Sequence, residues 1–298
     1  MRHRRTAFLL ACAILVIGSK RSGAQSSPSS AIPDTARSNS LDSHLVLIAE
    51  TKDSSSELAP SDLEIRVDGS PVVVTGLKKL GRVPVRYCVL FDISGSERGK
   101  FRAQVFLAAT VLSQVISADT DRGWADLFSD EVQETTEAET PQEIIGLLRQ
   151  QSPNGGTSLY DAMARCSERM QRAAAEGEQR VMFVFSDGDD DASRITQKQA
   201  GELLIGAGIR VYALATEFGQ RGKRIFETLC RLTGGRLLLA DDKGSMKHAG
   251  DRIVDDLISG VEVSYTTPAR KPKSGMSKIQ AKCRAKGIAV LAAEEVQR

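Results

Sequence analysis

Residues 87–96 read Tyr-Cys-Val-Leu-Phe-Asp-Ile-Ser-Gly-Ser. The apolar part of this stretch has the length of a buried strand, and it ends in the carboxylate of Asp92. Two hydroxyl side chains, Ser94 and Ser96, follow at every second position. Alternate side chains in an extended segment turn to the same side. The stretch therefore predicts a buried strand with a carboxylate and two hydroxyls facing one point at its carboxyl end.

Two later stretches place oxygen-bearing side chains in glycine-containing loops. Residues 154–162 read Asn-Gly-Gly-Thr-Ser-Leu-Tyr-Asp-Ala and carry Thr157, and Asp187 follows the apolar run 181–185. Glycine lacks a Cβ atom and so allows the backbone to approach closely. Together the three stretches supply two carboxylates and three hydroxyls, without a thiolate or an imidazole. Oxygen-only sets of this kind suit a hard divalent cation such as Mg²⁺.

Strands and helices are expected to alternate from residue 84 to residue 260. We expect strands at 85–91, 121–128, 180–185, 209–215 and 236–240, and helices at 101–116, 141–151, 159–175, 196–207, 224–232 and 247–259. This alternation predicts an α/β fold, a doubly wound and mostly parallel sheet with helices on both faces. Ligands bind beyond the carboxyl ends of the strands in such sheets, where Asp92 and Asp187 are expected.

The five residues Asp92, Ser94, Ser96, Thr157 and Asp187 resemble the metal-ion-dependent adhesion site of von Willebrand factor type A (VWA) domains, with all positions present and in order. The segments 155–162 and 186–188 also look like that family. The resemblance covers residues 84–260 and implies a Rossmann-like sheet. It implies that the serines and the threonine ligate the metal directly or through water, and that the aspartates act mainly through water and by charge.

The resemblance also implies a function and a wider site. The metal, Mg²⁺ or else Mn²⁺ or Ca²⁺, would take its last ligand from an Asp or Glu of a bound protein, which makes the chain an adhesion-type binding module and not an enzyme. Residues expected on the ligand side are Gly95, Glu97, Gly156, Ser158 and Gly188. Glu97 departs from the family, which often has a less charged residue there. It is expected to act as an outer acid or to shield the metal.

The segments outside 84–260 predict export and a small accessory β element. Residues 1–24 combine a basic start with the apolar run 6–18, too short for a comfortable membrane span, and predict a signal peptide. The protein is then secreted or periplasmic, or anchored if the signal is uncleaved. Residues 25–43 are rich in Ser, Pro and Ala and predict a disordered tether. Residues 44–83 and 261–298 predict strands, with a hairpin at 278–293, that pair in a second small sheet.

Charge and cysteine spacing exclude several classes of function. Residues 1–24 hold five of the 40 basic residues and none of the 38 acidic ones, so the exported chain has a slight acidic excess and no basic signature of nucleic-acid binding. The four cysteines after residue 24 form neither a CxxC pair nor a zinc pattern. Cys88, Cys166 and Cys230 are expected to be small buried residues.

Two other functions remain open from the sequence. One is a magnesium-dependent phosphatase or other hydrolase on a similar sheet, because an aspartate after the first strand is shared with aspartyl phosphatases. Those enzymes carry a second Asp where this chain has Ser94, and no lysine obviously follows to neutralise a phosphate. There is also no GxSxG elbow and no P-loop. The other is a structural scaffold whose metal site is vestigial.

Overall fold

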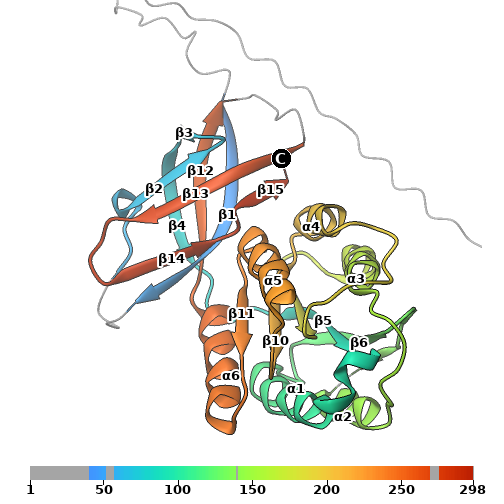
Figure 1. The fold of residues 1–298 in the computed structure, drawn as a ribbon. Helices are drawn as coiled ribbons and strands as arrows, with labels where there is room; N and C mark the ends of the chain where they lie inside the picture. Colours follow the sequence, from blue (N-terminus) through green and yellow to red (C-terminus); the bar gives the residue numbers. More distant parts are fainter. Residues whose placement is uncertain (1–39, 52–56, 139, 269–274, 298) are drawn as a thin grey trace, which may run out of the picture. The chain divides into compact units, whose positions relative to one another are not determined.

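The computed structural model describes residues 40–51, 57–138, 140–268 and 275–297. The expected signal peptide and most of the expected tether lie outside these residues. Among the described residues, seven strands form the main sheet, in the order β11-β10-β9-β5-β6-β7, with β8 also paired to β6 (Figure 1). Their bounds are β5 Val85–Asp92, β6 Arg122–Phe128, β7 Val132–Gln133, β8 Glu137–Ala138, β9 Gln179–Phe185, β10 Arg210–Ala215 and β11 Arg236–Leu239.

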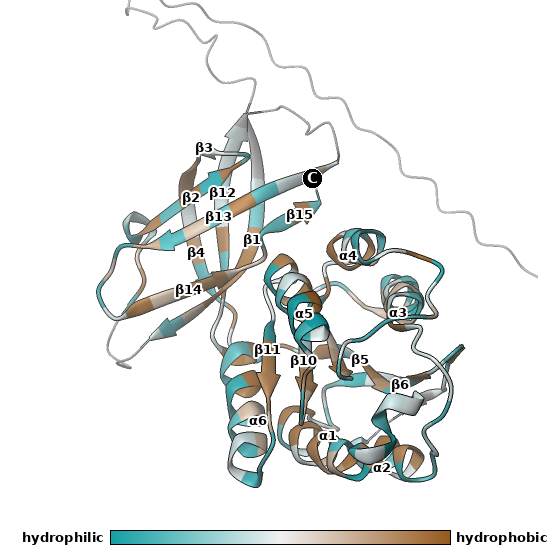
Figure 2. Ribbon diagram, in the orientation of Figure 1, coloured by the Kyte–Doolittle hydropathy of each residue, from teal (hydrophilic) through white to brown (hydrophobic). Residues whose placement is uncertain are grey.

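The five long strands of this sheet are parallel, and only β7 and β8 run antiparallel to β6. Alternate residues of β5 enter two separate cores. Tyr87, Val89 and Phe91 pack into one core with side chains of helices α1, α2 and α6, and Cys88 and Leu90 pack into the other with α3, α4 and α5. Figure 2 shows that β10 and β11 are hydrophobic over most of their length. The predicted sheet with helices on both faces is confirmed.

In the part of the chain that the structure describes, six α-helices cover the sheet: α1 Phe101–Val115, α2 Pro141–Arg149, α3 Leu159–Ala173, α4 Gln197–Gly206, α5 Gln220–Thr233 and α6 Lys243–Ile258. The first four lie close to their predicted ranges. Helices α5 and α6 each begin four residues earlier than predicted, and each has a glycine, Gly222 or Gly244, in its first turn. In α6 the side chain of Asp242 accepts a hydrogen bond from the backbone N–H of Ser245, which caps the helix at that earlier start.

The terminal segments form two further antiparallel sheets, in the orders β14-β1-β12-β4 and β15-β13-β2-β3. Apolar side chains of both sheets share one core, which includes Leu47, Ile65, Val263 and Ile279. The bounds are β1 Ser40–Thr51, β2 Leu63–Val67, β3 Ser70–Pro71, β4 Val73–Lys79, β12 Gly260–Pro268, β13 Met276–Cys283, β14 Ile288–Ala292 and β15 Glu295–Gln297. The expected pairing of N-terminal with C-terminal strands is confirmed, but it makes two sheets instead of one.

The expected C-terminal hairpin does not form. Strand β13 pairs with β2 and β15, whereas β14 pairs with β1 in the other sheet. The turn at 284–287 therefore connects the two sheets. Ile279 of β13 and Ile288 of β14 are both buried, although they belong to different sheets. Local sequence shows two strands and a turn, but it does not show which edge each strand will join.

Three observations complete the description. No helix among the described residues has both the length and the apolar character needed to cross a membrane. Cys88, Cys166 and Cys230 are buried free thiols, as expected, and Cys283 is a half-buried free thiol. Asp68 and Gly69 have positive φ angles of 51° and 80° and make the turn between β2 and β3.

Candidate metal centre

Two of the predicted carboxylates lie at the ends of neighbouring strands. Asp92 is the last residue of β5, and Asp187 follows the last residue of β9 by two positions. The strands are parallel and in register, with Phe91 opposite Phe185. From β5 the chain builds β6 on one side, and β9, β10 and β11 extend the sheet on the other. The site therefore lies where the strand order reverses, the position at which open α/β sheets form a crevice.

Asp92 is fully buried and both of its carboxylate oxygens accept hydrogen bonds. The backbone N–H of Ser94 donates to Oδ1 over 2.9 Å, and the hydroxyl of Ser186 donates to Oδ2 over 2.7 Å. Burial raises the pKa of Asp92 to about 6, against the lowering effect of these bonds. The hydroxyl oxygens of Ser94 and Ser96 lie 3.1 Å apart, and only Ser96 is exposed to solvent. The first predicted stretch thus brings its three oxygen groups to one place.

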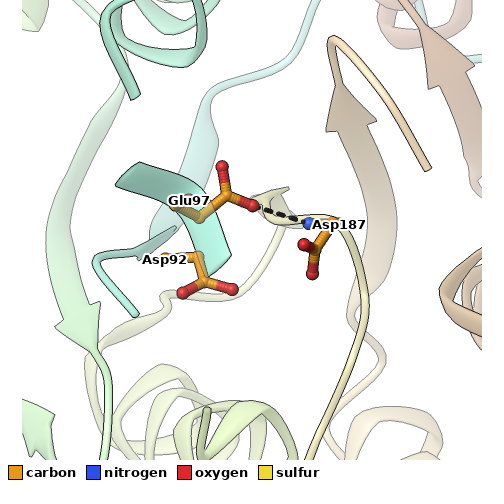
Figure 3. Close-up of side chains that lie close together, drawn as sticks. All are labelled: Asp92, Glu97 and Asp187. Carbon is orange, nitrogen blue, oxygen red and sulfur yellow. Dashed lines mark hydrogen bonds between the residues drawn. The ribbon is translucent and has the colours of Figure 1, made fainter. Parts of the chain in front are cut away.

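Glu97 and Asp187 complete a cluster of three carboxylates with Asp92 (Figure 3). One carboxylate oxygen from each residue lies within 4.8 Å of those from the other two. The backbone N–H of Asp187 donates to Glu97 Oε1 over 3.1 Å. Glu97 lies in the 3-10 helix Gly95–Gly99 and is fully buried. Its burial and the nearby charge of Asp92 raise its pKa to about 8.

The second oxygen of Glu97, Oε2, is buried and has no hydrogen-bond partner among the described residues. An orphaned carboxylate oxygen next to two further buried carboxylates is costly unless a positive charge compensates it. Hydroxyl and carboxylate oxygens are also the ligands that hard divalent cations prefer. The residues present therefore fit such a cation. Glu97 belongs to the carboxylate cluster itself.

Thr157 reaches this edge of the sheet on a loop tied to both carboxylate-bearing segments. The backbone N–H of Gly95 donates to the carbonyl oxygen of Gly155, and the backbone N–H of Thr157 donates to Asp191 Oδ1 over 2.7 Å. Gly156 is needed in this loop, because a Cβ atom there would lie 2.8 Å from the same Asp191 oxygen. Thr157 is buried. Asp191 of the mostly exposed acidic run 189–191 thus anchors this segment.

The other residues expected on the ligand side are also at this edge. Ser158 is buried, and its hydroxyl has no hydrogen-bond partner among the described residues. The backbone N–H of Gly188 donates to the hydroxyl of Ser186 over 3.0 Å. Gly222 in α5 permits a close approach here, because a Cβ atom on it would lie 1.9 Å from the backbone oxygen of Asp187. Helix α5 thus fixes the backbone that carries Asp187.

Sequence reasoning missed Lys100 and the role of Ser186. The ammonium of Lys100 donates to Asp187 Oδ2 over 2.8 Å and lies 3.5 Å from Glu97 Oε1. The sequence showed no lysine that obviously follows to neutralise a phosphate, but Lys100 lies at the site. Its signal in the sequence is the spacing of three from Glu97, since residues three apart in a helical turn lie on one side. Ser186 could have been found as the residue that follows β9 opposite Asp92.

The comparison with family models decides the classification. The model for the von Willebrand factor type A domain matches residues 88–238, more than half of the 298 residues. The chain belongs to the von Willebrand factor type A family. Domains of this family generally serve as interaction modules. The matched residues include all five predicted metal-site residues as well as Glu97 and Lys100.

A solved structure shows the same VWA fold, and two others align less closely. A von Willebrand factor type A protein from Catenulispora acidiphila aligns with a TM-score of 0.50 and 10% identity, over 87% of this chain and 72% of that one. An aerotolerance-related membrane protein from Bacteroides fragilis aligns with a TM-score of 0.47 and 15% identity, over 58% of this chain and 98% of that one. BatB from Bacteroides thetaiotaomicron aligns with the same values. No curated protein matches the chain.

Proposed function

We propose that this VWA protein is a metal-dependent protein-binding module that acts outside the cytoplasm. The observation that carries the proposal is the buried cluster of Asp92, Glu97 and Asp187, in which one oxygen of Glu97 has no hydrogen-bond partner among the described residues. The pKa values of Asp92 and Glu97 are raised. This means that the cluster as it stands favours protonation, and a divalent cation would remove that preference by supplying the missing charge.

In this proposal the metal is Mg²⁺, with Mn²⁺ or Ca²⁺ as alternatives. Ser94, Ser96 and Thr157 would hold it directly or through water, and Asp92 and Asp187 would act mainly through water and by charge. Neutral hydroxyls leave a divalent cation under-neutralised, so the bound metal would attract an anionic oxygen from outside. An Asp or Glu side chain of a protein partner is a group of that kind.

The proposed location rests on the sequence of residues 1–24. Their basic start and short apolar run are typical of a secretory signal. We therefore propose a secreted or periplasmic protein, or one that stays anchored through an uncleaved signal. A nucleic-acid partner is not proposed, because the chain without these residues has a slight acidic excess.

Thermal unfolding with and without millimolar Mg²⁺ or Mn²⁺ tests the metal site. A ligand that binds only the folded state stabilises it by about 2.7 kcal/mol at a hundredfold excess over its Kd. We expect the metal to raise the unfolding temperature of the wild type and not that of the double variant Ser94→Ala/Asp187→Ala. The variant Asp251→Ala, which removes a half-exposed carboxylate on α6, is the matched control and should respond like the wild type.

A partner search in metal and in chelator then tests the binding function. Association that requires both the metal and Asp92 would support the proposal, and an Asp92→Ala protein with full cation and partner binding would contradict it. Absence of any metal effect on stability or association would favour a structural scaffold whose metal site is vestigial. If the wild type turned over a phosphatase substrate and Asp92→Asn abolished this turnover, the protein would instead be a hydrolase.

A further inference from the structure

Lys100 places a positive charge of the protein itself among the site carboxylates. Its ammonium nitrogen lies 2.8 Å from Asp187 Oδ2 and 3.5 Å from Glu97 Oε1. The side chain of Lys100 is 21% exposed, whereas those of Asp187 and Glu97 are 9% and 0% exposed. An ion pair this close and this little exposed is screened much less by solvent and salt than a surface pair.

The backbone of Lys100 is fixed, so only its side chain is free to move. Its N–H donates to the carbonyl oxygen of Glu97 over 3.0 Å, and its own carbonyl accepts from Gln104 in the first turn of α1 over 3.0 Å. The ammonium donates a hydrogen bond to Asp187 Oδ2 over 2.8 Å. This contact holds the charged end of the lysine side chain at the site.

We propose that Lys100 is a built-in competitor of the divalent cation, which lowers the affinity of the site for metal by neutralising Asp187 when no metal is bound. This inference rests on the proposed metal site. Two cations repel one another within a poorly solvated cluster, and a metal would favour the same carboxylate that the ammonium now contacts. Metal loading must therefore break or lengthen the ion pair between Lys100 and Asp187.

The competition has a functional consequence. Lys100 would raise the metal concentration at which the site is half filled. Metal loading, and with it partner binding, would therefore respond to the metal level outside the cell. Loading would also release an ammonium at the rim of the site, where the approaching partner brings a carboxylate.

Binding of Mn²⁺ alone, followed by calorimetry and by electron paramagnetic resonance on the full chain, tests the proposal. We expect Lys100→Met to bind Mn²⁺ at least about tenfold more tightly than the wild type, because a unit positive charge a few ångströms from the metal is lost. Lys100→Arg keeps the charge and should remain within about threefold of the wild type. Lys198→Met removes a lysine of α4 whose side chain is 86% exposed, and it should change the affinity less than about twofold.

A second readout follows the lysine instead of the metal. Acetylation of Lys100 by acetic anhydride, measured by mass spectrometry, should become faster when Mn²⁺ is added to the wild type, because the ammonium loses its partner. Acetylation of Lys198 should not change. Circular dichroism of each variant confirms that it is folded before its affinity is compared.

The outcomes separate this inference from the proposed function. Tighter binding by Lys100→Met, or binding by that variant alone, supports the competition. Equal or weaker binding by Lys100→Met, or an acetylation rate of Lys100 that Mn²⁺ does not change, overturns the competition and leaves the metal site standing. Absence of Mn²⁺ binding in every protein overturns both.

Discussion

Replacing Glu97 with Gln should remove a pH dependence from the stability of the metal-free protein. The pKa of Glu97 is about 8 in the folded state, against 4.5 for an unperturbed Glu, because burial and the charge of Asp92 disfavour its ionised form. The folded state therefore binds more protons than the unfolded chain between these two values. By linkage, the free energy of unfolding must fall as pH rises through that window.

The interval from pH 6 to pH 8 covers most of the ionisation of Glu97. Asp92, with a pKa of about 6, is already half ionised at pH 6. Because folded Glu97 is itself half ionised at pH 8, its contribution falls from about 1.4 kcal/mol per pH unit at pH 6 to about half of that at pH 8, or roughly 2.3 kcal/mol over the interval. The neutral amide of Glu97→Gln cannot ionise, so its stability should not show this loss. At pH 8 the variant should be more stable than the wild type by about 4 kcal/mol, the cost of ionising Glu97 in its buried position.

Urea unfolding at 25 °C in chelator, at pH 6, 7 and 8, measures this effect. The difference between wild type and Glu97→Gln cancels the titration of the groups that do not interact with Glu97. Glu57→Gln, which changes a side chain that is 87% exposed, is the control and should keep the wild-type slope. Saturating Mg²⁺ should flatten the wild-type slope, because a bound cation favours the ionised carboxylate. If Glu97→Gln loses stability with pH as steeply as the wild type, the reasoning about its burial is wrong.

Two further predictions concern the scaffold of the site. Ser186→Ala leaves an oxygen of buried Asp92 and a backbone N–H without their partner and should cost about 2–4 kcal/mol in urea unfolding. Ser167 is equally buried, but Ser167→Ala removes only a hydrogen bond from the hydroxyl to a carbonyl of its own helix and should cost under about 1 kcal/mol. Equal losses of stability in the two variants would contradict this account. Gly222→Ala puts a Cβ atom 1.9 Å from a backbone oxygen of the metal-site loop, so it should lower the unfolding temperature and weaken Mn²⁺ binding. Gly146→Ala on α2 meets no atom within 4 Å and should stabilise by up to about 1 kcal/mol, so a similar response of both variants would contradict the predicted crowding.

The main sheet was predictable because its signals are local. The apolar runs before Asp92 and Asp187 have the length of buried strands, and the intervening segments have helical periodicity. Alternation of the two kinds of element leaves few topologies other than a parallel sheet with helices on both faces. Once the sheet is parallel, the residues that follow β5 and β9 must lie at one edge. The sequence alone therefore predicts that the two aspartates lie close together.

The accessory strands were less predictable because their pairing is not local. Residues 278–293 show two strand signals and a turn, which are also the features of a hairpin. The structure instead sends β13 and β14 to different sheets. Their partners, β1 and β2, lie more than 200 residues earlier in the chain. The choice depends on which sheet edges are free after the rest of the chain has folded.

The sequence by itself determined the fold class, the family and the five residues that resemble a metal site. Only the tertiary structure decided the charge balance of that site. It buried Glu97 beside Asp92 and Asp187, left one Glu97 oxygen without a partner among the described residues, and brought Lys100 against Asp187. The physical reason is that the strength of an electrostatic interaction depends on the distance between the groups, and the cost of burying a charge depends on the exclusion of water. The packing of separate segments sets both the distance and the exclusion of water.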